Sequence, residues 1–245
     1  MMKIMTKSRA NGYSLVELLL ATVIFTIIAG AAFSLLFSTQ LRYRSESDVT
    51  TSFQQANVAI DQITRDVHST GYPPPSSFAP PATLAQRNQQ YPKLMALPFS
   101  WSPGYTNTPP TPCTVLGSCG AVPGDDDLIL ETNTGDGNGV QWIRYSLQGT
   151  TLMRGMTPKV AWADPVASTS AAGILTPYLD NVMNGSQSLA IFSYGYDSTN
   201  PAKQPSNIRV VNIMLIVQSA EPDPQTHQFR TITLTGQAAR FNPND

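Results

Sequence analysis

The chain has 245 residues, a formal net charge of −1 and only 13% charged residues. This balance gives no basic field of the kind that non-specific nucleic-acid binding requires, so we expect no nucleic-acid partner. Outside one apolar N-terminal segment roughly 200 residues remain, which is enough for one domain with a core of ordinary size.

The first twelve residues form a short basic leader with Lys3, Lys7 and Arg9 and no acid. An apolar run then extends from Gly12 to Phe37, GYSLVELLLATVIFTIIAGAAFSLLF, and is long enough to span a bilayer as a helix. By the positive-inside rule the leader stays in the cytoplasm and the C-terminal body is exported. The alternative is a secretory signal peptide, but its small cleavage residue would follow the apolar segment, whereas Gly12 precedes it.

Glu17 is the single charged residue in this run. Burying an unpaired charge in hydrocarbon costs on the order of 3 kcal/mol or more, so an acid at this depth is a candidate functional residue.

The segment from Gly12 to Glu17 (GYSLVE) resembles the cleavage signature of type IV prepilins. The resemblance implies that prepilin peptidase, a membrane aspartyl peptidase, cuts after Gly12 and that the new amine of Tyr13 is N-methylated. It also implies that Glu17 pairs with the positively charged N-terminus of a neighbouring subunit during assembly, where a low dielectric strengthens the interaction. The alternative is an ordinary signal anchor in which Glu17 is incidental.

Beyond the apolar run, residues 38–72 continue the helix as an amphipathic segment. The pattern ends at Gly71 and the prolines from Pro73, which are typical of a helix terminus. We expect one helix from about Tyr13 to Thr70, with residues 13–37 in the membrane and the polar residues of the second half, Asp66 included, on its exposed side. The apolar residues recur at spacings of three and four and therefore share one face: Val49, Phe53, Ala56, Ile60, Ile63 and Val67.

Residues 73–124 are rich in proline, serine, threonine and glycine, which favours a long loop. The aromatic residues Phe99, Trp101 and Tyr105 either face a partner or pin this loop to the domain. Cys113 and Cys119 lie close together in it, and in an oxidising compartment we expect them to form a short disulfide, with free thiols as the alternative.

Residues 125–245 alternate strand patterns with turns, which predicts an antiparallel sheet domain. The pattern in 208–217 is apolar on both faces, as expected for a central strand covered on both sides, one of them by the helix. The fold class is therefore α+β, a long N-terminal helix packed on an antiparallel β-sheet. The predicted strands are 127–132, 140–147, 151–156, 189–196, 208–217 and 230–234.

The best candidate for a metal site is the acidic, glycine-rich region with Asp125, Asp127, Asp136 and Asn138, whose oxygen atoms would suit calcium. The spacing of an EF-hand loop is incomplete, because the twelfth residue counted from Asp127 is Asn138 and not glutamate. A hairpin turn explains the same residues, so we expect no metal.

The two histidines, His68 and His227, lie beside no recognisable serine or cysteine nucleophile. We interpret both as solvated, and expect neither an enzyme nor a cofactor.

Several later segments are similar to minor pilins of the PilW type and to the related J-type pseudopilins of type II secretion: AIDQITRDVHSTGY, DDLILETN, IRYSLQGTTLMRG, LAIFSYGYD and RTITLTGQAARFN. The resemblance implies a single-pass inner-membrane protein with a cytoplasmic N-terminus, which later enters a pilus or pseudopilus. It would assemble into or prime a type IV pilus, with other pilins, prepilin peptidase and the inner-membrane assembly platform as partners. The alternatives are a pseudopilin of type II secretion, and an adhesion or DNA-binding module displayed by a filament.

One departure concerns the membrane segment, where major pilins commonly carry a proline at the position of Ser34. Gly30 is the remaining source of flexibility in this part of the helix.

Overall fold

The computed structural model describes residues 14–74, 77, 96, 99, 125–160, 163, 165–197 and 208–241. The predicted cleavage and methylation residues, Gly12 and Tyr13, lie outside these ranges, as do Cys113 and Cys119 with their expected disulfide. Trp101 and Tyr105 also lie outside them, whereas Phe99 is buried and forms an isolated antiparallel bridge with Leu130.

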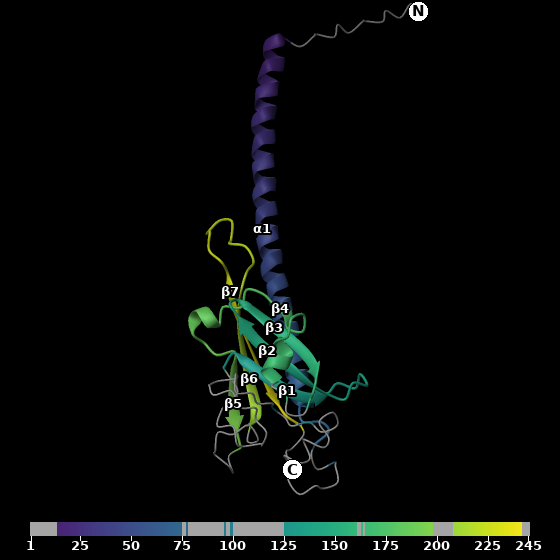
Figure 1. The fold of residues 1–245 in the computed structure, drawn as a ribbon. Coiled ribbons are helices and arrows are strands. Elements are labelled where there is room, and N and C mark those ends of the chain that lie inside the picture. The colour runs from purple at the N-terminus through teal and green to yellow at the C-terminus, as the bar shows by residue number, and fades with distance from the viewer. Residues whose placement is uncertain are drawn as a thin grey trace, which may run out of the picture.

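The N-terminal helix α1 runs from Leu15 to Ser69, which confirms the predicted long helix. It is continuous through both Gly30 and Ser34, and its 55 residues give a length of about 80 Å at 1.5 Å per residue. Its first part projects alone, and its second part lies along the body of the domain (Figure 1).

The strands form two antiparallel sheets, where the sequence predicts one. The first sheet has the order β1-β2-β3-β4 and the second the order β5-β6-β7, so β6 is the central strand of its sheet, as predicted. A short helix α3 (Pro165–Ser170) and a 3₁₀ turn η2 (Gly185–Gln187) were not predicted from the sequence. The strands are β1 (Asp127–Asn133), β2 (Val140–Gln148), β3 (Thr151–Pro158), β4 (Thr176–Leu179), β5 (Phe192–Tyr196), β6 (Ile208–Gln218) and β7 (Thr231–Ala239).

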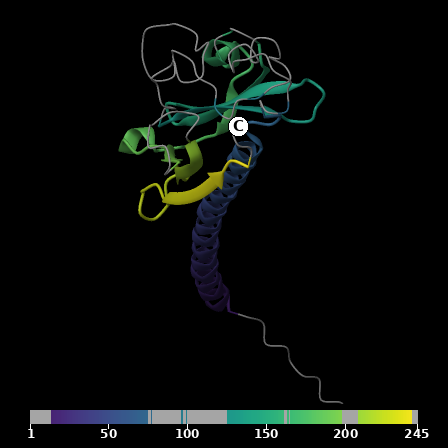
Figure 2. The ribbon, with the colours of Figure 1, turned by 90° about the horizontal axis from the view of Figure 1, so that it is seen from below.

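The two sheets are joined by backbone hydrogen bonds at two places. At the start of β5, the N–H of Phe192 donates to the carbonyl of Asp125, just before β1, at 2.8 Å. Elsewhere, the N–H of Val182 donates to Thr150 at 2.8 Å, and Val182 also bridges Val217 near the end of β6. The sheets therefore form one body, and Figure 2 shows the helix emerging from it.

The core lies between α1 and the inner faces of both sheets, and the helix packs on β7, β6, β1 and β4. The predicted apolar stripe is buried only in its C-terminal part, since Val49 is half-buried and Phe53 is 42% exposed. The outer face of β6 is only partly covered. The buried helix residues are Ala56, Ala59, Ile60, Ile63, Asp66 and Val67.

Helix and sheet approach most closely where Gly236 of β7 meets Ile60 of α1. A Cβ atom added to Gly236 would lie 2.6 Å from the Cγ2 atom of Ile60, which is closer than van der Waals packing allows. The position therefore requires a glycine, because Ile60 is β-branched and its χ1 is stiff.

We expect Gly236→Val to lower the free energy of unfolding by about 1 to 3 kcal/mol, because the added side chain overpacks the helix–sheet contact. The matched control is Thr235→Val. Thr235 immediately precedes Gly236 and is exposed on the other face of β7. Thermal unfolding of the full chain in detergent, followed by circular dichroism, measures both. Equal stability of the two variants would contradict a steric requirement at Gly236.

Candidate assembly site in the N-terminal helix

The first half of α1 exposes an apolar surface along its whole length. The side chains of Leu15, Phe25, Phe33 and Phe37 are all more than half exposed, and none of the most apolar stretch is buried in the body. In the part of the chain that the structure describes, α1 is the one helix long and apolar enough to cross a membrane. A surface of this size requires either lipid or other apolar helices around it.

Three threonine hydroxyl groups in this half of the helix are satisfied within the helix. Thr22 donates to the carbonyl of Leu19 at 2.8 Å, and Thr39 donates to that of Leu35 at 2.8 Å. Thr26 likewise donates to the carbonyl of Thr22. Because lipid offers no hydrogen-bond partners, such local pairing lets these residues lie in a bilayer.

Glu17 lies in the first turn of α1, and its carboxylate turns back toward the start of the helix. Its Oε2 atom accepts a hydrogen bond from the backbone N–H of Ser14, the N-cap residue, at 2.9 Å. This contact satisfies a backbone donor and places negative charge at the positive end of the helix dipole. The resemblance to type IV prepilins implies a partner for Glu17 on a neighbouring subunit, and the structure shows a separate contact within the chain.

A buried polar cluster attaches the second half of α1 to the first sheet. The Oδ2 atom of Asp66 accepts hydrogen bonds from the hydroxyl of Tyr145 at 2.5 Å and from Nη2 of Arg154 at 3.0 Å. Its Oδ1 atom accepts from Nε2 of Gln62 at 2.9 Å. Asp66 is buried, so its predicted exposed position is wrong. Helix periodicity misses it, because its partners lie on β2 and β3.

Burial raises the pKa of Tyr145 above its usual range, and the negative charge of Asp66 raises it further, while Arg154 acts in the opposite direction. Tyr145 therefore stays a neutral donor to Asp66 at any pH near neutrality.

A second polar cluster lies on the other face of the first sheet. Nε1 of Trp142 donates to Oε1 of Glu131 at 2.9 Å, and Nζ of Lys159 pairs with Oε2 of the same carboxylate. All three side chains are buried. The sequence analysis did not single them out, although the period of two along each strand places Glu131 and Trp142 on a shared face, and the strand register makes them direct neighbours.

The four calcium candidates are not brought into one site. Asp127, at the start of β1, forms a salt bridge with Arg144 at 2.5 Å, whereas Asp136 lies in the turn beyond the other end of β1 and accepts from the backbone N–H of Asn138 at 2.9 Å. Asp125 precedes β1 and bonds to β5 through its backbone. Within the described ranges, no group of three or more histidine, cysteine or acidic residues is placed to hold a metal ion.

The two histidines lie in different surroundings. The ring of His68 is half-buried and packs against Phe241 in a tilted arrangement with 4.4 Å between ring centroids, so it is only partly solvated. His227 lies exposed in the connection between β6 and β7, as expected.

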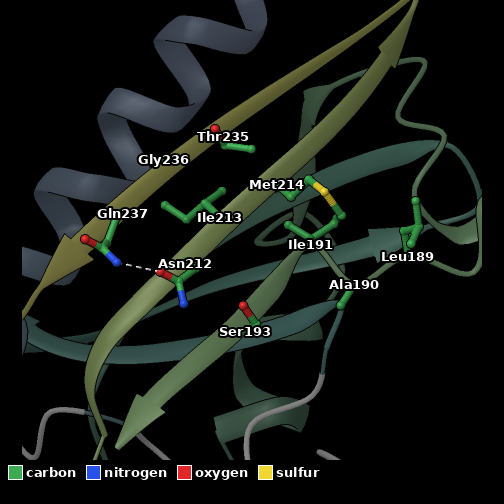
Figure 3. Close-up of a pocket in the computed structure, with 10 residues that line it drawn as sticks. All are labelled: Leu189, Ala190, Ile191, Ser193, Asn212, Ile213, Met214, Thr235, Gly236 and Gln237. Carbon is green, nitrogen blue, oxygen red and sulfur yellow. Dashed lines mark hydrogen bonds between the residues drawn. The ribbon is translucent and has the colours of Figure 1, made fainter.

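The outer face of the second sheet carries an open hollow of about 690 Å³ (Figure 3). Its lining supplies hydroxyl and amide groups, among them Ser193, Thr235 and the hydrogen-bonded pair Gln237 and Asn212, together with apolar side chains such as Met214. None of its ten lining residues is acidic, basic or a cysteine.

Residues 7–33 match the family model for the prokaryotic N-terminal methylation motif. The match includes Gly12, Tyr13 and Glu17 and most of the exposed apolar part of α1. No curated protein and no solved structure matches the chain. The motif and the exposed apolar helix together indicate a type IV prepilin-like protein, a membrane-anchored subunit of a class that is structural rather than catalytic.

The raised pKa of Tyr145 predicts a loss of stability at alkaline pH. The unfolded chain releases this proton near pH 10, while the folded chain retains it. Tyr145 therefore stabilises the folded chain fully below pH 10. Above pH 10 the free energy of unfolding falls by up to about 1.4 kcal/mol per pH unit. Tyr145→Phe removes this group, so the free energy of unfolding should fall less steeply above pH 10, by the contribution of one proton. The substitution should also lower the free energy of unfolding at neutral pH by about 1 to 3 kcal/mol, because it removes a buried hydrogen bond.

Chemical unfolding of the full chain between pH 7 and pH 11 measures the slope. The matched control is Tyr43→Phe, which makes the same change at a tyrosine that is 76% exposed on α1. A slope that Tyr145→Phe does not change would show that Tyr145 is not the group that retains its proton.

Proposed function

We propose that this type IV prepilin-like protein is a minor pilin of the PilW type, which assembles into or primes a type IV pilus. The observation that carries the proposal is the exposed apolar half of α1, with Glu17 turned back toward its start. The sequence resemblance in the later segments supports the PilW type, and the N-terminal methylation motif supports the general class.

Assembly is the role that this geometry suits best. When the subunit leaves the membrane, its apolar helix must be covered again, and the corresponding helices of neighbouring subunits offer a surface of the same kind. A filament forms when each subunit makes head-to-tail contacts with the next. The shared helix then lies in the centre, and the sheets lie outside it.

Glu17 would fix the axial position of each subunit in this filament. Cleavage after Gly12 creates a positively charged amine on Tyr13, and the carboxylate of Glu17 would pair with the amine of a neighbouring subunit. Between packed apolar helices the dielectric is low, so the pairing is stronger than in water and an unpaired carboxylate is costly. In the single subunit the Ser14 N–H already keeps the carboxylate at this end of the helix.

The proposed partners and location follow from this role. Prepilin peptidase would cut the leader in the inner membrane, and the assembly platform would receive the mature subunit, with its body on the extracytoplasmic side.

We expect Gly12→Trp to block removal of the leader, because the peptidase requires a small residue before the cut. The protein is co-expressed with prepilin peptidase, and its intact mass is measured. The matched control is Gly30→Trp, which makes the same change inside the apolar segment where nothing lies within 4 Å of the added Cβ. If the chain without substitutions keeps its leader when it is co-expressed with active peptidase, the prepilin interpretation is excluded.

Glu17→Ala is expected to leave cleavage, membrane insertion and the fold of the body intact, and to reduce incorporation into filaments several-fold, since the neighbour's amine loses its partner. Sheared filaments are collected from strains that lack the native gene and carry either the unchanged gene or one variant. Motility and secretion are measured in the same strains. The control is Asp180→Ala, an exposed acid on the body outside the connection between β6 and β7. Equal recovery of both variants, with equal motility and secretion, would leave the signal-anchor alternative as the better one.

A further inference from the structure

The connection between β6 and β7, residues 219–230, runs beside α1 close to the end of the apolar segment (Figure 1). We call it the β6–β7 loop. Nη1 of Arg230 pairs with Oε1 of Glu46 on the helix at 2.9 Å, and its Nη2 pairs with Oδ2 of Asp223 at 2.6 Å. The side-chain amide of Gln225 is oriented so that its oxygen faces donors and its nitrogen faces acceptors. In this orientation the amide oxygen accepts a hydrogen bond from Nη2 of Arg42 at 2.7 Å. The loop is therefore held against the helix at two levels.

The loop has a defined internal structure. The carboxylate of Asp223 accepts hydrogen bonds from the backbone N–H groups of Gln225 and Thr226 at 2.8 and 3.1 Å. These bonds, together with Arg230, lower the pKa of Asp223 to about 2, so its charge persists at physiological pH. The N–H of His227 also donates to the carbonyl of Asp223 at 2.8 Å.

The position of the loop along α1 fixes its depth relative to a membrane. The continuous apolar run of α1 ends at Phe37, and Arg42 follows five residues later, or about 8 Å along the axis at 1.5 Å per residue. The headgroup region on each side of the hydrocarbon core is roughly 5 to 8 Å thick. Arg42 and the Gln225 side chain that contacts it therefore lie at the headgroup level whenever α1 spans the bilayer.

The side chains at this level suit a membrane surface. Tyr43 is 76% exposed, and Arg42 and Arg44 flank it. Aromatic side chains of this kind are enriched at the membrane interface, and arginine extends its charge to the headgroups from an apolar stem.

A polar hollow of about 280 Å³ lies between the helix and the loop. Its lining includes two guanidinium groups, of Arg42 and Arg230, and two carboxylates, of Glu46 and Asp223. This pattern complements a zwitterionic headgroup, in which a phosphate meets guanidinium groups and an ammonium meets carboxylates.

We propose that the β6–β7 loop is a second membrane contact of this protein: while α1 spans the bilayer, the ion pairs of Arg230 with Glu46 and Asp223 hold the loop among zwitterionic phospholipid headgroups. With helix and loop both engaged, the body is held in one orientation on the membrane surface. The proposal rests on the membrane span of α1 and does not depend on a role in a pilus.

The test uses the full chain at one copy per nanodisc, so that no second copy can cover the loop. The discs contain phosphatidylcholine with a nitroxide attached to a fraction of the headgroups. A fluorescent amino acid is introduced genetically at Thr226 in the loop, at Leu36 in the apolar segment, or at Thr134 in the turn after β1. Because Thr132 bonds to Ser69 at the far end of α1, Thr134 lies about 50 Å along the helix from Phe37.

We expect the label at Thr226 to be quenched about as strongly as the label at Leu36, and several-fold more than the label at Thr134. Arg230→Gln should reduce quenching at Thr226, because it breaks the pairs with Glu46 and Asp223. The matched control is Arg209→Gln, which breaks a similarly exposed ion pair with Asp197 outside the loop. Circular dichroism checks that both variants fold.

Two results would overturn the proposal. If Leu36 is quenched while Thr226 is quenched no more than Thr134, the helix is inserted but the loop does not reach the headgroups. If Arg230→Gln and Arg209→Gln leave the same quenching at Thr226, the ion pairs of Arg230 do not hold the loop at the membrane. In either case the membrane span and the proposed role in assembly would be unaffected.

Discussion

The packing of α1 against both sheets is the contact on which the rest of the structure depends. One continuous helix has an apolar surface all round in its first half and a single buried face in its second. The buried face fills the space between two sheets that are joined to each other by few backbone bonds. The small residues Ala56 and Ala59 and the glycine of β7 opposite Ile60 bring the helix close enough to close the core.

Polar groups then restrict how the helix can lie within this apolar contact. Apolar burial is non-directional, so apart from close fits such as that of Gly236 with Ile60 it restricts rotation and sliding of the helix only weakly. Asp66 limits this freedom, since only one position of α1 brings its carboxylate to Tyr145 and Arg154. Moving the helix would leave a buried charge unpaired, which is much more costly than a repacked methyl group. The helix is thus fixed both along and around its axis relative to the first sheet.

This rigidity has a consequence for a membrane-anchored subunit. The helix has no break between the turn that carries Glu17 and the turn that carries Asp66, so a displacement at the membrane end is transmitted to the body. The β6–β7 loop adds a contact where the helix leaves the body, which limits bending at that point. The position of the body is then set by the helix and the loop together.

The sequence by itself determined the features that depend on local pattern. The apolar run, its basic leader and Glu17 identify the membrane segment and its motif, because length and charge are read directly from the chain. The periods of 3.6 and 2 predicted the long helix and the strands other than the short β4. The tertiary structure decided which distant residues meet. It divided the strands between two sheets, separated Asp127 from Asp136, and buried Asp66 and Lys159 beside partners of opposite charge or hydrogen-bonding type. A local sequence pattern predicts that a charged residue is exposed. Its burial becomes favourable only when a partner from another element compensates for the loss of its hydration.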